Sequence, residues 1–380
     1  MIPWETFLTW QKDWFEIYPY AIESRRKFLA DTPFLSQAHF KHARDTVRFG
    51  RRMLVKDYAY AYVAQLALDS SVATTPHRKR LLDLAEEHEI NQSPDPQRWF
   101  EGLSLFDQSI SVAHIEARDP IESISTDINQ MIKFIIARLF VGGFRKIEVH
   151  SYHDPKNGYA VTADNISIDH PLDRPRLDER VVPMTCRQIE HNGFTYMDHR
   201  IKDPFETWLK IHRQIKEKRV KDPFFVNDRC GLVFVLFSRE ECFQFAERLT
   251  NELLCDGGEI IERLETNSDG KTVDAENLNS SPNFKAAKML VKCHGRVFEF
   301  QFVTFHDYIT STLSLTDANH ELYKLRQALN FSLPLLWPES LYGVNWADEE
   351  IRERLFVCKE SQLGWRVMRK DRKRIEPLLR

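Results

Sequence analysis

The segment RVFEFQFVTF places a carboxylate inside a strongly apolar stretch. Side chains alternate between the two faces of a β-strand, so Phe298, Phe300 and Phe302 share one face while Glu299 and Gln301 share the other. We expect the phenylalanine face to pack against helices. A carboxylate in such a strand is costly unless it is solvated or binds something. Glu299 therefore indicates either an exposed sheet face or a polar cleft that could hold a cation.

A second acidic residue, Asp228, lies in the segment NDRCG, just before the apolar run GLVFVLF. That run is typical of a buried central strand. A carboxylate at the start of such a strand is well placed to hold Mg²⁺. Gly231 removes a side chain where a phosphate or a neighbouring strand could come close. Asp and Gly are also common in ordinary turns, so this segment alone does not decide between the two interpretations.

Taken together with their neighbours, these segments resemble the motifs of RelA/SpoT-type (p)ppGpp synthetase domains, in the order in which that family has them. The resemblance covers roughly residues 195–330. The matching segments are 200–205, 228–231, 281–288, 299–304 and 319–324, which resemble the family motifs RxKxxxS…K, DxxGxR, PKxNGYxSxH, ExQxRT and EHxxYK in turn.

The resemblance implies pyrophosphate transfer from ATP to the 3′-hydroxyl of an unidentified acceptor, driven by positioning and charge neutralisation. Asp228 and Glu299 would bind Mg²⁺, and Glu299 would help to deprotonate the attacking hydroxyl. Phe284 would stack on a base. The other residues implied to bind the nucleotide are Lys202, Lys210, Arg213, Lys216, Arg229, Lys285, Lys288, Gln301, His320 and Lys324.

The sequence departs from the family pattern at several of these positions. Val233 and Val303 stand where the family has arginines, and Ala286 and Lys288 stand where it has Ser and His. Valine cannot replace the bidentate phosphate contacts of arginine. Two alternatives to a transferase of ATP therefore stay open. One is a catalytically degenerate module that senses a nucleotide or binds a protein, and the other is a relative that modifies RNA ends.

A second string, Asp154-Pro-Lys-Asn-Gly-Tyr159, copies PKxNGY more closely than residues 282–284 do. It lies before Asp228 and so is out of order. Asn-Gly between two alternating strands is the usual signature of a hairpin, and we interpret the string as a turn. The pairs His153-Asp154 and His306-Asp307 lack helical metal-ligand spacing, which favours surface or capping roles.

The elements that must position these residues follow from hydrophobic periodicity. We expect an α+β protein, with a helical region followed by a nucleotidyltransferase-like mixed sheet flanked by helices. The expected ranges are 1–140 for the helical region, 141–330 for the RelA/SpoT-like domain and 331–380 for an extension with a basic tail. Ser238 and Glu241 resemble a capping box at the start of a helix.

The composition of the chain limits the classes of protein to which it can belong. Apolar residues make up 42% of the 380 residues, which is enough for a sizeable core, and a formal net charge of −3 excludes a polycation that coats nucleic acid. No apolar run is long enough to span a membrane, and the six cysteines form no CxxC pair. We expect a cytoplasmic protein that binds nucleotides and no membrane. RNA could contact the basic tail, and a protein partner could contact residues 1–140.

Overall fold

The structure of the chain is a computed structural model that describes residues 37–62, 96–153, 159–161, 164, 166–168, 179–189, 194–216, 226–264 and 286–375. The chain forms two compact units that interleave along the sequence. The helical unit comprises residues 1–121, 202–226 and 327–355, and the sheet unit comprises residues 122–201, 227–326 and 356–380.

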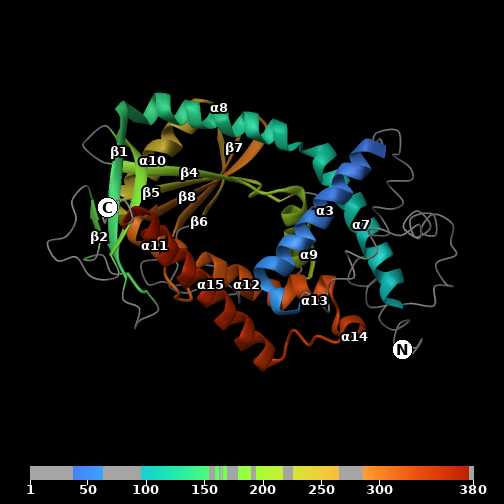
Figure 1. The fold of residues 1–380 in the computed structure, drawn as a ribbon. Coiled ribbons are helices and arrows are strands. Elements are labelled where there is room, and N and C mark those ends of the chain that lie inside the picture. Colours follow the sequence, from blue (N-terminus) through green and yellow to red (C-terminus); the bar gives the residue numbers. More distant parts are fainter. Residues whose placement is uncertain are drawn as a thin grey trace. The chain divides into compact units, whose positions relative to one another are not determined.

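The sheet unit contains one eight-stranded sheet in the order β2-β1-β3-β4-β5-β8-β7-β6 (Figure 1). Only the central pair β5 and β8 is parallel; the other neighbours in the sheet are antiparallel. The strands are β1 (Phe140–Tyr152), β2 (Ile166–Ile168), β3 (Glu179–Ile189), β4 (Phe194–Ile201), β5 (Cys230–Leu236), β6 (Glu259–Leu264), β7 (Ala287–Cys293) and β8 (Arg296–Thr304).

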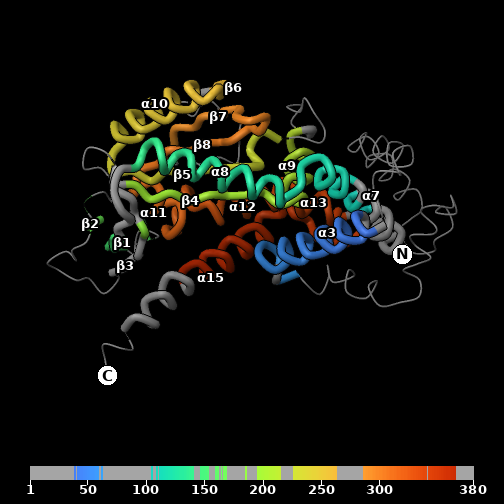
Figure 2. The backbone as a smooth tube through the Cα atoms, turned by 90° about the horizontal axis from the view of Figure 1, so that it is seen from above, coloured from blue at the N-terminus to red at the C-terminus, as the bar shows by residue number. Residues whose placement is uncertain are grey.

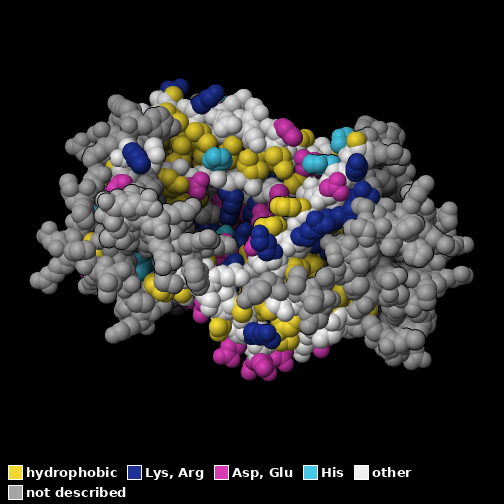
Figure 3. All heavy atoms as spheres, viewed as in Figure 1, with side chains coloured by type: hydrophobic (Ala, Val, Ile, Leu, Met, Phe, Trp, Pro, Cys, Tyr) yellow, Lys and Arg dark blue, Asp and Glu magenta, His cyan; other side chains and the backbone are white. Residues whose placement is uncertain are grey.

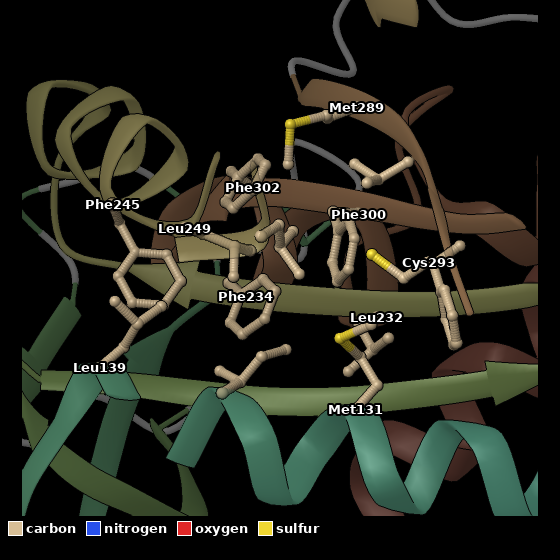
Figure 4. Packing of buried hydrophobic residues seen from close by; sticks show 14 of the residues in the cluster. Met131, Leu139, Leu232, Phe234, Phe245, Leu249, Met289, Cys293, Phe300 and Phe302 are labelled. Atoms are coloured by element: carbon tan, nitrogen blue, oxygen red, sulfur yellow. The ribbon is translucent and has the colours of Figure 1, made fainter. Parts of the chain in front are cut away.

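One face of the central strands carries the larger apolar core of this unit. Helices α8 (Ile121–Leu139) and α10 (Arg239–Cys255) pack against it. Figure 4 shows Phe300 and Phe302 of β8 pointing toward Phe234 of β5 and Leu249 of α10. The expected packing of the phenylalanine face against helices is therefore confirmed.

The opposite face carries a smaller apolar cluster. Helix α11 (Phe305–Leu313) follows β8 directly and places Phe305 and Ile309 in a smaller apolar cluster with Val235 and Val303. Thr304 caps this helix, because its side chain accepts a hydrogen bond from the backbone N–H of Asp307. The smaller cluster therefore lies near the carboxyl ends of β5 and β8. The polar residues Glu299 and Gln301 lie on the same face of β8, closer to its amino end.

Helix α10 begins as the sequence predicts. The Ser238 side chain accepts a hydrogen bond from the backbone N–H of Glu241, and the Glu241 carboxylate accepts one from the backbone N–H of Ser238. This is the capping box expected from residues 238 and 241.

The helical unit is built around α3 (Gln37–Tyr58), α7 (Pro96–Arg118) and α9 (Pro204–Lys216), which contact one another pairwise (Figure 2). Gly50 of α3 allows the Phe205 ring to approach, since a Cβ at residue 50 would lie 2.0 Å from that ring. The Arg51 guanidinium stacks over the Trp337 ring. The remaining short elements are η1 (Tyr60–Tyr62), η5 (Ala328–Ser332), α13 (Leu333–Leu336) and α14 (Glu339–Tyr342).

The structure describes two further helices. Helix α12 (His320–Gln327) lies almost wholly in the sheet unit. Helix α15 (Glu349–Ile375) begins in the helical unit, and its part from Phe356 onward belongs to the sheet unit. Within the described part of the chain, no helix is both long and apolar enough to cross a lipid bilayer.

The expected α+β architecture, with a mixed sheet flanked by helices, is confirmed at this coarse level. The alternating segments at 145–152, 159–168 and 193–201 predict strands, whereas β3, which carries Pro183 in its middle opposite Glu148 of β1, is not expected from the sequence. Proline inside an apparent strand normally argues against a central position, and this is why the sequence pattern passes over it.

Candidate functional site

A row of residues crosses the centre of the sheet at Glu299. Arg200 of β4 lies opposite Gly231 of β5, and Gly231 lies opposite Glu299 of β8. Residues opposite each other on adjacent strands project to the same face. Arg200 and Glu299 therefore share one face, with a residue that has no side chain between them.

The Arg200 side chain reaches across this gap. Its Nη2 lies 3.9 Å from Oε1 of Glu299. The strands are spaced about 4.8 Å apart, so the two Cα atoms are about 10 Å apart and the arginine must lie along the sheet surface. A Cβ at residue 231 would lie 3.8 Å from Arg200 Nε, which shows that the arginine passes over the glycine.

Glu299 is held by a second contact as well. The Gln301 side-chain amide donates a hydrogen bond to Oε1 of Glu299. The Glu299 side chain is only 11% exposed, whereas that of Arg200 is 40% exposed. The carboxylate is thus largely removed from water, and the guanidinium that faces it remains able to move. The exposed-face interpretation of Glu299 is therefore wrong, and the polar-cleft interpretation fits better.

The next row along the same strands is also polar at both ends. Asp198 of β4 lies opposite Val233 of β5, Val233 opposite Gln301 of β8, and Gln301 opposite Lys288 of β7. Asp198 is exposed and Lys288 is half-buried. Val233 packs against the smaller apolar cluster, so this row has one apolar position, next to Asp198, while Gln301 and Lys288 are polar.

Two tyrosines border the site at the third row. The rings of Tyr196 and Tyr308 lie 5.6 Å apart, between centroids. Burial, followed by the nearby Tyr196 hydroxyl and the Asp198 carboxylate, raises the pKa of Tyr308 above its ordinary value. Tyr308 therefore remains a neutral phenol at physiological pH and can act there only as a hydrogen-bonding or stacking group.

Asp228 lies in the turn just before β5 and is buried. Arg229, next to it, is buried as well. β5 and β8 run parallel and side by side, so Asp228 precedes one central strand and Glu299 lies on the other. That the two carboxylates share one metal ion stays a prediction. Among the described residues, no group of three or more His, Cys, Asp or Glu side chains is placed to hold a metal.

The predicted nucleotide-binding residues divide between the two units. Helix α9 carries Lys210, Arg213 and Lys216, and Lys202 lies just before it, so these four belong to the helical unit. Lys288, Gln301 and Arg229 belong to the sheet unit. Gln301 contacts Glu299, and a contribution from the α9 residues stays a prediction.

His320 and Lys324 belong to the sheet unit and lie on α12, one helical turn apart. Their neighbour Glu321 pairs with Lys359 of α15 at 2.8 Å. Phe284 and Lys285 fall outside the described residues, as do Asp154 to Gly158. The turn interpretation of that string therefore stays a prediction.

The two histidine–aspartate pairs behave differently from each other. Thr304 rather than the His306-Asp307 pair caps α11; Asp307 takes part through its backbone N–H, which donates to the Thr304 hydroxyl, and His306 donates from Nε2 to the carbonyl of Val161. The surface interpretation of His153 is wrong: its ring is buried, and Nε2 lies 2.9 Å from Ser151 Oγ. Its Nδ1 donates to the carbonyl of Tyr159, at 3.1 Å. Burial is possible here because both ring nitrogens have partners.

Sequence reasoning gave no role to Arg200 or Asp198, although Arg200 lies in one of the quoted motifs. Their spacing could have indicated a shared role, because Tyr196, Asp198 and Arg200 are two residues apart along β4 and therefore lie on the same face of the sheet. What the sequence lacks is the register that brings this face beside Glu299.

The predicted contact of the basic tail with RNA concerns side chains beyond residue 364, which lie outside the described residues. The start of α15 is acidic instead. Asp348, Glu349, Glu350 and Glu353 are exposed there. Figure 3 shows acidic side chains gathered at the lower edge of the view.

No protein-family model matches the chain, and a search of curated proteins gives no significant match. The function must therefore be argued from these side chains and their arrangement.

Proposed function

We propose that the sheet unit binds a nucleotide together with Mg²⁺ on the Glu299 face and transfers a pyrophosphoryl group from ATP to an acceptor hydroxyl. The observation that carries the proposal is the nearly buried Glu299 carboxylate at the centre of the sheet, beside a glycine on the parallel neighbouring strand. A carboxylate is retained in such a place when it binds a cation or moves a proton.

The carboxylates of Glu299 and Asp228 have the chemistry that a magnesium ion needs. Mg²⁺ prefers carboxylate and other oxygen ligands, which Glu299 and Asp228 would supply. The carboxylate of Glu299 already lies beside a cationic group, the guanidinium of Arg200, which stands in for the metal charge. When bound, Mg²⁺ would neutralise charge on the transferred phosphates.

The side chains have separable roles in this chemistry. Both contacts to Glu299 involve Oε1, and we assign Oε2 as the atom that takes the proton of the attacking hydroxyl. The hydroxyl oxygen then bonds to the β-phosphorus of ATP, and AMP leaves with the electron pair of the broken bond. Arg200 and Lys288 would face the phosphates from either side of Glu299, and Gln301 orients the carboxylate.

A second candidate function, nucleotide sensing without turnover, is favoured by one specific feature. Val303 is buried in the smaller apolar cluster and Val233 packs against that cluster. Apolar side chains at these two positions can bind no phosphate, so fewer groups are left to stabilise the charge of a transition state. A sensor would bind Mg²⁺ and ATP on the same face and release ATP unchanged.

A transfer assay separates the two functions. The purified chain is incubated with ATP labelled at the γ-phosphate, with Mg²⁺, and with a panel of nucleotides and RNAs. We expect label in one acceptor, and a loss of about a hundredfold or more in rate in Glu299→Gln, as for removal of a general base.

Glu247→Gln is the matched control, since Glu247 is an exposed carboxylate on α10, which packs on the other face of the sheet. It should transfer at the wild-type rate. ATP binding without transfer to any acceptor would favour the sensor, and a Glu299→Gln variant with full transfer activity would refute the role of Glu299.

A further inference from the structure

We infer that Arg200 closes the Glu299 carboxylate to free divalent cations, so that the site accepts a metal only together with a polyphosphate that draws the arginine away. This inference concerns the regulation of the proposed site and rests on the proposed function. The chemical class of ligand is a metal–polyphosphate complex rather than a free ion.

The register of three strands carries the inference. Arg200, Gly231 and Glu299 are opposite one another in turn, so the only route from the arginine to the carboxylate passes over residue 231. Because that residue is glycine, the arginine side chain can lie flat on the sheet, with Nε above the glycine and Nη2 at 3.9 Å from Oε1. The carboxylate thus has a cationic partner supplied by its own sheet.

A free metal ion and this guanidinium compete for one carboxylate. An ion that binds the carboxylate lies close to the positive charge of the guanidinium, and the repulsion between the two weakens binding of the ion. A polyphosphate favours binding of the metal, because it gives the guanidinium another partner. Guanidinium groups bind phosphate oxygens through paired charge-assisted hydrogen bonds. The Arg200 side chain has the freedom to make this change, since it is 40% exposed while that of Glu299 is 11% exposed.

The test measures binding of Mn²⁺ alone, without nucleotide, by the electron paramagnetic resonance of the free ion. The wild type should bind Mn²⁺ weakly at the sheet. Arg200→Gln should bind it about tenfold more tightly or better, since loss of one charged contact changes an equilibrium constant by about that factor. The gain should disappear in the double variant Arg200→Gln with Glu299→Gln.

The chain offers a matched control for the loss of an arginine from an ion pair. Arg138 of α8 lies 4.0 Å from Glu252 of α10, on the other side of the sheet. Arg138→Gln removes the same charge from a pair of the same type and should leave Mn²⁺ binding unchanged. Equal Mn²⁺ affinity in the wild type and in Arg200→Gln would overturn the inference, as would an equal gain in Arg138→Gln.

A second variant keeps the arginine and moves it. In Gly231→Val the Cγ atoms extend beyond a Cβ position that already lies 3.8 Å from Arg200 Nε, so the arginine must leave its place. The same gain in Mn²⁺ affinity is expected, and no gain would contradict the inference. A wild type that fails to bind ATP with Mg²⁺ would instead refute the proposed function, so the two failures are distinguishable.

Discussion

At the scale of single residues, the environment of Glu299 depends on a glycine as much as on the charged groups around it. Gly231 makes no contact of its own through a side chain, yet it allows Arg200 to reach a carboxylate two strands away. Glu299 is thereby stabilised in a setting where an isolated carboxylate would be costly. The sequence predicts the glycine as a place of close approach, and the structure shows that the approaching group is an arginine of the same sheet.

A second residue-scale feature predicts a pH dependence of stability. Burial lowers the pKa of His212, on α9, to about 4 from an ordinary 6.5, although its Nδ1–H donates to the carbonyl of Trp208. Between these two pH values the unfolded chain binds a proton that the folded chain does not. Stability is therefore fully present above pH 6.5 and falls as the pH drops toward 4.

The contribution of His212 to this loss is about 3 kcal/mol, from the shift of its pKa. Urea unfolding at a series of pH values measures it. His212→Gln should flatten the pH dependence in this window, whereas His199→Gln, which changes an exposed histidine of β4, should not. An unchanged slope in His212→Gln would show that His212 titrates normally in the folded chain.

At the scale of elements, one buried ion pair joins two helices. Lys359 of α15 is nearly inaccessible, and its Nζ lies 2.8 Å from Oε2 of Glu321 on α12. Burial alone would raise the pKa of Glu321, but the hydrogen bond and charge of Lys359 lower it overall. The contribution of the pair to stability is therefore fully present above the ordinary pKa of a glutamate, and it is lost as the pH falls through the lowered pKa of Glu321 in the folded chain.

Removing one partner of this pair should cost more than removing both. Lys359→Met leaves the Glu321 carboxylate partly buried without its cation. Breaking a fully buried ion pair costs about 3–5 kcal/mol of folding stability. The cost here should be lower, because the Glu321 side chain is 33% exposed. The double variant with Glu321→Gln should recover part of that loss. Chemical denaturation of the three variants provides the test, and additive losses would contradict a direct interaction.

Element type was largely predictable from the sequence because each strand and helix satisfies its own local pattern. The runs at 230–236 and 296–304 form the two central strands, and Ser238 begins α10 as its capping box predicts. β3 is missed because the signal of Pro183 outweighs the neighbouring apolar residues. The Arg200–Glu299 contact could not be predicted, because it depends on the register between β4, β5 and β8, and register is a property of the folded sheet.

At the scale of the whole molecule, the two compact units do not follow the order of the chain. Helix α8 belongs mainly to the sheet unit, although the sequence places it at the end of a helical stretch, and α9 belongs to the helical unit although strands flank it. Hydrophobic periodicity identifies a helix but not the surface that its apolar face covers. For α8 that surface is the phenylalanine face of β8, which Ile124, Ile128 and Met131 help to bury.

The central claim is that the Glu299 face binds ATP together with Mg²⁺, and calorimetric titration of ATP tests it most directly. The wild type, Glu299→Gln and the control Glu247→Gln are each titrated with Mg²⁺ and with a chelator. We predict binding that requires Mg²⁺, is weakened about tenfold or more in Glu299→Gln, and is unchanged in Glu247→Gln. No binding by the wild type at millimolar ATP, or equal binding by Glu299→Gln, would contradict the account.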